Sequence, residues 1–261
     1  MIELKKEIKW NSFEICIDGN SYTDDGIFEI TSDDFLIFSE SRYKEKTRNG
    51  LIDALSNAKR AIDCQVDWII SYLGYDYMNF KEEKYPYLKK AIEEFEAELN
   101  PYINCSFKLR FIQALEIAPT FLISKIREIR NKMEHNYILP NEEEVREAIE
   151  IAKLFVNATQ NIVLHKNTTN YFLYNTNTNK LTDNYSFPTP NIGVSFGFIK
   201  EGHAQIKVRS SLTEDKFIFN AECNEYIYFV KTALTNKFYY LPSLFGCDIE
   251  REHIKYEITY A

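Results

Sequence analysis

The chain has few glycine and proline residues, eight and seven in 261, and it has no apolar run of the length that crosses a membrane. With so few residues that break or loosen the backbone, we expect packed structure throughout and no long flexible linker. The N-terminal residues also lack the apolar core of a signal peptide. We therefore predict a cytoplasmic protein with no membrane partner.

Cysteine and histidine are both sparse and scattered. The five cysteines are odd in number and include no C-x-x-C pair, which favours free core thiols over a disulfide framework. None of the four histidines stands at a zinc-binding spacing, so we predict no metal and no cofactor; only a metal site assembled from distant residues stays open. The glycine-rich phosphate loops, the G-x-S-x-G elbow and the H-E-x-x-H motif are also absent from the sequence.

Aromatic residues are abundant instead, at 15% of the chain, and apolar residues make up 45%. A chain of this length and composition can bury a sizeable core in one large or two ordinary domains. The formal charge of −8 disfavours non-specific binding of nucleic acid over the whole surface. Basic residues cluster locally, at residues 42–48 and 125–132, so we expect any contact with nucleic acid to be local.

The apolar pattern changes twice along the chain, which predicts an α+β protein in three segments. Residues 1–39 contain two expected strands, 7–17 and 26–31, that would form a β-hairpin. Because an isolated hairpin is marginally stable, we expect it to pack on the C-terminal region. Residues 40–165 have a helical pattern, and residues 166–261 have a β-rich one.

The middle segment predicts an up-and-down helical bundle, and the last segment predicts a mostly antiparallel β domain. Asn141 and Glu144 match a capping box at the start of the last helix. Residues 225–234 fit either a strand or a helix, and residues 254–260 alternate most clearly as a strand. The helices of the bundle are expected at residues 46–73, 85–99, 106–117, 119–135 and 141–164.

Residues 125–137 are locally basic in an acidic protein and close one of these predicted helices. Helical spacing places Arg127, Asn131 and His135 within about 80° of one another, on one face. Arg130 lies about 140° from His135 on the same ideal helix. Arg130 must therefore reach round on its long side chain, or the last turn must unwind, or the partner of each side chain must come from another protomer.

The order of these residues resembles the signature of the HEPN superfamily of all-helical domains. Arg130 is followed after four residues by His135 and after one more by Tyr137, and the polar Asn131 stands directly after the arginine. The helix at residues 51–67 is similar to the first long helix of such domains. The resemblance covers about half of the chain.

This resemblance implies a homodimer in which two protomers bring Arg130 and His135 into one cleft. The implied activity is that of a metal-independent endoribonuclease of defence or toxin type, with Asn131 positioning the RNA. Arg127, which shares a helix face with Asn131, is a further predicted RNA-binding residue. A histidine titrates near neutrality and suits proton transfer, whereas an arginine stays charged and matches phosphate geometry. In HEPN toxins paired with a nucleotidyltransferase antitoxin, the motif tyrosine receives AMP, which makes Tyr137 a candidate modification site.

Each of these residues also has a plainer interpretation. Arg130 could pair with Glu134, His135 could interact with the dipole at the end of its own helix, and Tyr137 could pack under that end. The charged residues on the first long helix could flank the cleft or form a solvated face with ordinary i,i+4 pairs. These residues are Lys59, Arg60, Asp63 and Asp67.

Two other functions therefore stay open. The first is a non-catalytic HEPN module that dimerises and binds a nucleotide or a protein partner, with the β-rich segment as a sensor. The second is a structural or assembly protein in which the motif is a relic. Exposure of His135 in a cleft that faces a second protomer would favour the enzyme, because the composite site requires it.

Overall fold

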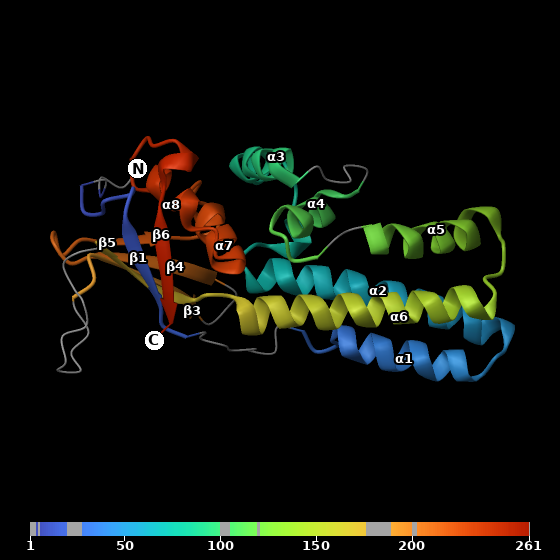
Figure 1. Cartoon of the computed structure of the whole chain (residues 1–261). Coiled ribbons are helices and arrows are strands. Elements are labelled where there is room, and N and C mark those ends of the chain that lie inside the picture. Colours follow the sequence, from blue (N-terminus) through green and yellow to red (C-terminus); the bar gives the residue numbers. More distant parts are fainter. Residues whose placement is uncertain are drawn as a thin grey trace. The chain divides into compact units, whose positions relative to one another are not determined.

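The computed structural model describes residues 4, 6–19, 28–99, 105–118, 121–175, 189–199 and 203–260. The chain forms two compact units (Figure 1). We call Met1–Thr23 with Leu164–Ala261 the sheet unit, and Asp24–Val163 the helical unit. The protein is α+β, as predicted. The first division falls earlier than the predicted boundary after residue 39.

In the described part of the sheet unit, six strands form a mixed sheet in the order β5-β4-β3-β2-β1-β6. β1 and β6 run parallel, and the other neighbouring strands run antiparallel. Alternation along β1 places Phe13, Ile15 and Ile17 in the core. The strands are β1 Phe13–Ile17, β2 Asn170–Asn175, β3 Ile192–Ile199, β4 His203–Ser210, β5 Lys216–Phe219 and β6 Tyr256–Tyr260.

The predicted N-terminal hairpin is wrong for the residues that the structure describes. β1 has a neighbour on each edge, since Ile15 pairs with Leu173 of β2 and with Ile258 of β6. Residues 28–31, the end of the expected second strand, form no strand, and residues 20–27 lie outside the described part. The physical reason is a capping box in which Thr31 starts a helix instead.

Short helices complete the sheet unit. The ambiguous stretch after residue 225 is a helix, α7 Tyr226–Thr235, and α8 is Leu241–Leu244. α7 packs on the sheet through Phe229, whose ring centroid lies 5.3 Å from that of Phe219 in β5. Two 3-10 turns, Phe238–Tyr240 and Arg251–His253, connect the remaining chain.

The described residues of the helical unit form six α-helices, and Figure 1 shows α1, α2 and α6 lying side by side. The helices predicted from the three- and four-residue steps are all present, whereas α1 was not predicted. The helices are α1 Ser32–Lys44, α2 Arg48–Tyr72, α3 Pro86–Leu99, α4 Phe107–Ala114, α5 Phe121–Asn136 and α6 Glu142–Gln160, with a 3-10 turn at Tyr77–Asn79. A π-helical turn, Asn161–Lys166, follows α6 and runs across the division between the two units.

The long helix α2 is the centre of this unit. Its apolar stripe is buried, and a buried amide fixes its register against two neighbours. Gln65 accepts a hydrogen bond from Ser32 of α1 at 2.8 Å and donates one to Thr159 of α6 at 3.0 Å. Each such bond contributes about 1 kcal/mol net, and losing either partner would leave a buried polar group unpaired. α2 is therefore held rigidly while its other face carries charged side chains.

No helix in the described part of the chain combines the length and apolar character needed to span a membrane.

Candidate functional site

A cavity of about 470 Å³ opens between α2, α4 and α5 of the helical unit. Its size falls within the range of small-ligand pockets, about 300–1,000 Å³, and its walls carry more charged and polar than apolar residues. The lining residues are Lys59, Ile62, Asp63, Val66, Asp67, Ser106, Lys108, Leu109, Ile123, Arg127, Arg130 and Asn131.

Packing of α5 explains why its polar residues face this cavity. Ile126 and Ile129 are buried at the three-residue step of a helix. That packing turns the neighbouring positions Arg127, Arg130 and Asn131 to the cavity wall. Three of the five site residues predicted from the sequence are thus brought together in one place.

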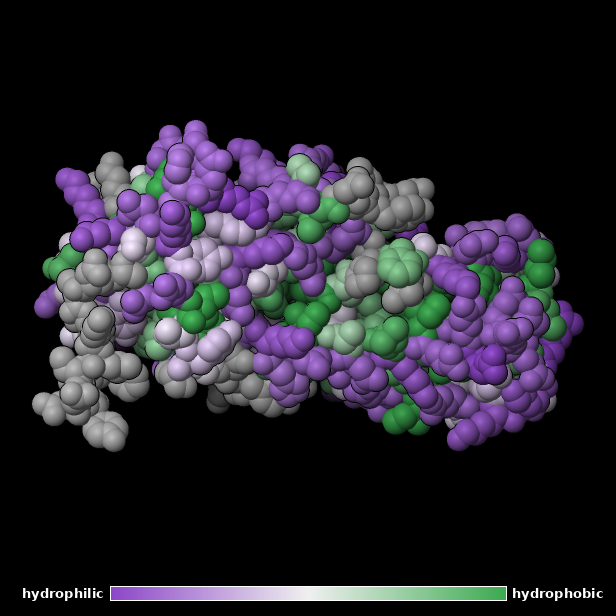
Figure 2. Space-filling model, in the orientation of Figure 1, coloured by the Kyte–Doolittle hydropathy of each residue, from purple (hydrophilic) through white to green (hydrophobic). Residues whose placement is uncertain are grey.

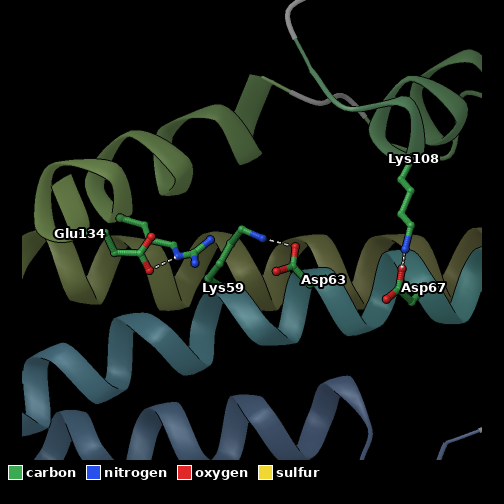
Figure 3. A network of polar contacts seen from close by, with 6 residues as sticks. Lys59, Asp63, Asp67, Lys108 and Glu134 are labelled. Atoms are coloured by element: carbon green, nitrogen blue, oxygen red, sulfur yellow. Dashed lines mark hydrogen bonds and ion pairs between the residues drawn. The ribbon is translucent and has the colours of Figure 1, made fainter. Parts of the chain in front are cut away.

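The facing wall comes from α2, with a contribution from α4. Lys59, Asp63 and Asp67 recur every four residues, which keeps them on one side of α2. The side chain of Lys59 is only 12% exposed, so its ammonium group is held in place rather than free in solvent. Lys108 reaches down from α4 to the same side of α2 (Figure 3).

Ion pairs run in a row along this wall, as Figure 3 shows. Lys59 pairs with Asp63, and Lys108 Nζ lies 2.6 Å from Asp67 Oδ1. On α5, Arg130 Nε lies 2.6 Å from Glu134 Oε1. The plainer predictions for Arg130 and for the Lys59–Asp63 pair are therefore confirmed, although the same residues also line the cavity.

The balance of charge in the cavity favours an anion. Its lining includes four cationic side chains and two carboxylates, and a third carboxylate, that of Glu134, pairs with Arg130. Within the described residues, Arg127 has no ion-pair partner, so its charge is not neutralised locally. A positively charged, partly enclosed site of this kind suits a phosphate or another anionic group.

His135 lies elsewhere. It is exposed in the last turn of α5, and it is not among the residues that line the cavity. Arg127 and Asn131 share a helix face with it, but the cavity ends before the turn that carries the histidine. A single chain therefore brings the predicted arginines and asparagine together and leaves His135 outside the cavity.

Tyr137 follows directly after α5 and is 89% exposed, so the prediction of an aromatic packed under the helix end is wrong. Its φ of 56° is left-handed, a conformation that often ends a helix but rarely with a bulky residue. Ile138 N–H donates to Lys132 O at 3.3 Å and closes the turn. Ile138 and Leu139 are also exposed, and Figure 2 shows hydrophobic surface where α5 turns into α6.

The cysteine thiols and one exposed acidic cluster do not form a second candidate site. Burial raises the pKa of Cys64 to about 11, and burial also raises the pKa of Cys105, so neither thiol is an activated nucleophile. Among the described residues, one group has side chains close enough to share a metal ion, namely Glu250, Glu252 and His253 of the sheet unit. All three are exposed, and exposed acidic clusters are common without a metal.

The sequence did not single out Lys108 or Ser106, because α4 reaches the cavity only through the tertiary fold.

Comparison of the chain with protein-family models, with curated proteins and with solved structures finds no match.

Proposed function

We propose that the protein binds RNA in this cavity and cleaves it as a homodimeric, metal-independent endoribonuclease that resembles HEPN toxins. The observation that supports the proposal is the common location of Arg127, Arg130 and Asn131, which line one cavity together with Lys59 and Lys108. These are the residue types that hold a phosphodiester; Arg130 and Asn131 come from the motif that suggested the activity, and Arg127 lies one helical turn before Asn131.

In the proposed reaction, the 2′-hydroxyl of RNA attacks the adjacent phosphorus while the bond to the 5′-oxygen breaks. A base takes the proton of the 2′-hydroxyl and an acid gives a proton to the 5′-oxygen, leaving a 2′,3′-cyclic phosphate and a 5′-hydroxyl. His135 is the proposed proton-transfer group, and Arg130 stabilises the charge on the phosphorane oxygens. Because His135 lies outside the cavity of its own protomer, a second protomer would present it to the RNA.

The exposure of Tyr137 supports its proposed role as a modification site, because a nucleotidyltransferase partner would need access to the phenol. Transfer of AMP from ATP to that oxygen, with loss of the phenol proton and release of pyrophosphate, would add bulk and negative charge two residues after His135. The proposal includes such an antitoxin and a cytoplasmic location.

The position of His135 also favours a second candidate function. If no second protomer completes the site, the cavity binds RNA or a nucleotide without cleaving it. The protein would then be a binding and dimerisation module, with the sheet unit as its sensor.

The deciding experiment is RNA cleavage by the full-length protein in excess EDTA. We expect wild-type protein to produce 2′,3′-cyclic phosphate ends, and His135→Ala and Arg130→Ala to lower the rate about 100-fold or more. His253→Ala and Arg146→Ala are matched controls, because both side chains are exposed and neither lines the cavity. Sedimentation should show the same dimer for every variant.

Absence of cleavage by wild-type protein, with RNA binding retained, would support the binding module. Equal activity of wild type and His135→Ala would overturn the assigned catalytic role.

A further inference from the structure

The carboxylates of the cavity are not required to hold a phosphate, yet two of them stand beside its lysines. Asp63 pairs with Lys59 and Asp67 pairs with Lys108 (Figure 3). Among the described residues that line the cavity, these are the acidic ones. Their function in an anion site needs its own explanation.

We propose that Lys59 and Lys108 contact successive phosphates of a single-stranded RNA, and that Asp63 and Asp67 lower its affinity by competing for the same ammonium groups. This inference rests on the proposed function, because it takes RNA as the ligand. It extends the binding site beyond the motif of α5 to residues of α2 and α4.

Helical geometry supports contacts with successive phosphates. Asp63 and Asp67 are four residues apart on α2, which corresponds to a rise of about 6 Å. Each aspartate holds one lysine ammonium, so the two ammonium groups lie beside carboxylates that are about one helical turn apart. This spacing is close to the repeat of phosphates in an extended nucleic-acid strand, and Arg127 and Arg130 on the opposite wall can hold the phosphate beside them.

Burial and charge support the competition. Lys59 is 12% exposed and Lys108 is 32% exposed, so both ammonium groups are confined near their carboxylates. A carboxylate and a phosphodiester each carry one negative charge and accept the same N–H donors. RNA that binds here exchanges one anion for another at each lysine, whereas at Arg127 it meets a cation with no ion-pair partner in the described part of the chain.

The opposite role for the aspartates makes a different prediction. If Asp63 and Asp67 accepted hydrogen bonds from ribose hydroxyls or bases, they would contribute to affinity. Neutralising them would then weaken RNA binding rather than strengthen it.

The test is binding of a fluorescein-labelled, single-stranded oligouridylate with 2′-O-methyl groups, which cannot be cleaved through its 2′-oxygen. Asp63→Asn and Asp67→Asn should each bind about two- to fivefold more tightly than wild type, as expected for removing one partly exposed ion pair. Asp53→Asn is the matched control, because Asp53 is an exposed residue of the same helix outside the cavity. Equal or weaker binding by both Asn variants would overturn the inference.

Lys108→Gln and Lys59→Gln should weaken binding and should each reduce the slope of log affinity against log salt by about 0.7, the value expected when one phosphate of a single strand is no longer neutralised. Lys90→Gln, an exposed charge on α3, is the control. An unchanged slope for both cavity variants would show that these lysines do not contact phosphate.

Because the probe cannot be cut, this test is separate from the test of catalysis. Tighter binding by the Asn variants of a protein that cuts no RNA would retain the inference and reject the ribonuclease. Cleavage by wild-type protein, with no tighter RNA binding by the Asn variants, would retain the ribonuclease and reject the inference.

Discussion

The first turns of α5 are packed against other helices of the same chain, whereas its last turn is exposed. In the first part, Ile126 and Ile129 are buried, and Arg127 faces a cavity that two other helices complete. In the last part, His135 and Tyr137 are exposed, as are the residues that follow up to Leu139. Thus the proposed phosphate contacts are fixed by the fold of one protomer, whereas the proposed proton-transfer group is not.

This difference separates binding from catalysis in physical terms. Preorganised contacts in a packed wall need no further ordering when a ligand arrives, so they give affinity. A side chain at an exposed helix end gains a fixed position only from a partner or a substrate. Variants that act on one part and not the other can therefore test the comparison.

The largest expected effect is a loss of stability from the packed part. Ile126 is fully buried, so Ile126→Ala should lower the free energy of unfolding by about 2–5 kcal/mol, because it removes apolar packing and leaves a cavity. The matched change Ile138→Ala, at a side chain 55% exposed, should lower it by less than about 0.5 kcal/mol. Urea denaturation of both variants measures the difference, and similar losses would show that the two parts are packed alike.

A smaller effect is expected for thiol reactivity on α2, the helix that forms the facing wall. Burial raises the pKa of Cys64 from 9.0 to about 11, so less thiolate is present at pH 8. The remaining thiolate is more nucleophilic, and the net result should be alkylation by iodoacetamide about tenfold slower than in urea-unfolded protein. Peptide mass spectrometry gives the rate for Cys64, and equal folded and unfolded rates would contradict the raised pKa.

The same pKa shift has a consequence for stability. A thiol with a raised pKa in the folded state favours folding while it is protonated. Its contribution should be complete below pH 9 and should be lost as the pH rises from about 9 towards 11. The matched variant Cys64→Ala should show a weaker decline over that range.

The smallest effect is expected at the exposed end of α5. Tyr137 has a left-handed backbone that glycine adopts without steric cost, so Tyr137→Gly should raise the free energy of unfolding by about 0.5–1 kcal/mol. Tyr137→Ala keeps the Cβ and should give no such gain. Thermal melts of the two variants measure the effect, and destabilisation by the glycine would mean that the phenol makes contacts that its 89% exposure does not suggest.

Helices α2 to α6 could be predicted from local pattern, whereas α1 and the strand partners of β1 were not predicted. The apolar residues of α2 recur regularly over many turns, which indicates a helix. Near α1 the signals conflict, because a strand-like stretch ends where the capping box of Thr31 and Asp34 begins a helix. That capping box was present in the sequence as a signal. The parallel pairing of β1 with β6 had no local signal, because it joins residues far apart in the chain.

The candidate site was predictable to a similar extent. One wall of the cavity carries Arg127, Arg130 and Asn131. Their spacing on one helix, next to buried isoleucines, can be read from the sequence. The pairing of Lys108 with Asp67 depends on how α4 crosses α2, and no sequence period encodes that crossing. Whether His135 meets a second protomer depends on association, which is a property of surfaces rather than of periodicity.

The position of β1 between β2 and the edge strand β6 has a consequence for synthesis on the ribosome. This strand emerges early, but both of its partners, β2 and β6, follow the whole helical unit in the chain. The helices can fold from local contacts as they emerge, while β1 has no native neighbour until residues near 170 are made. The sheet therefore cannot begin to form around β1 until β2 has been made, after the whole helical unit.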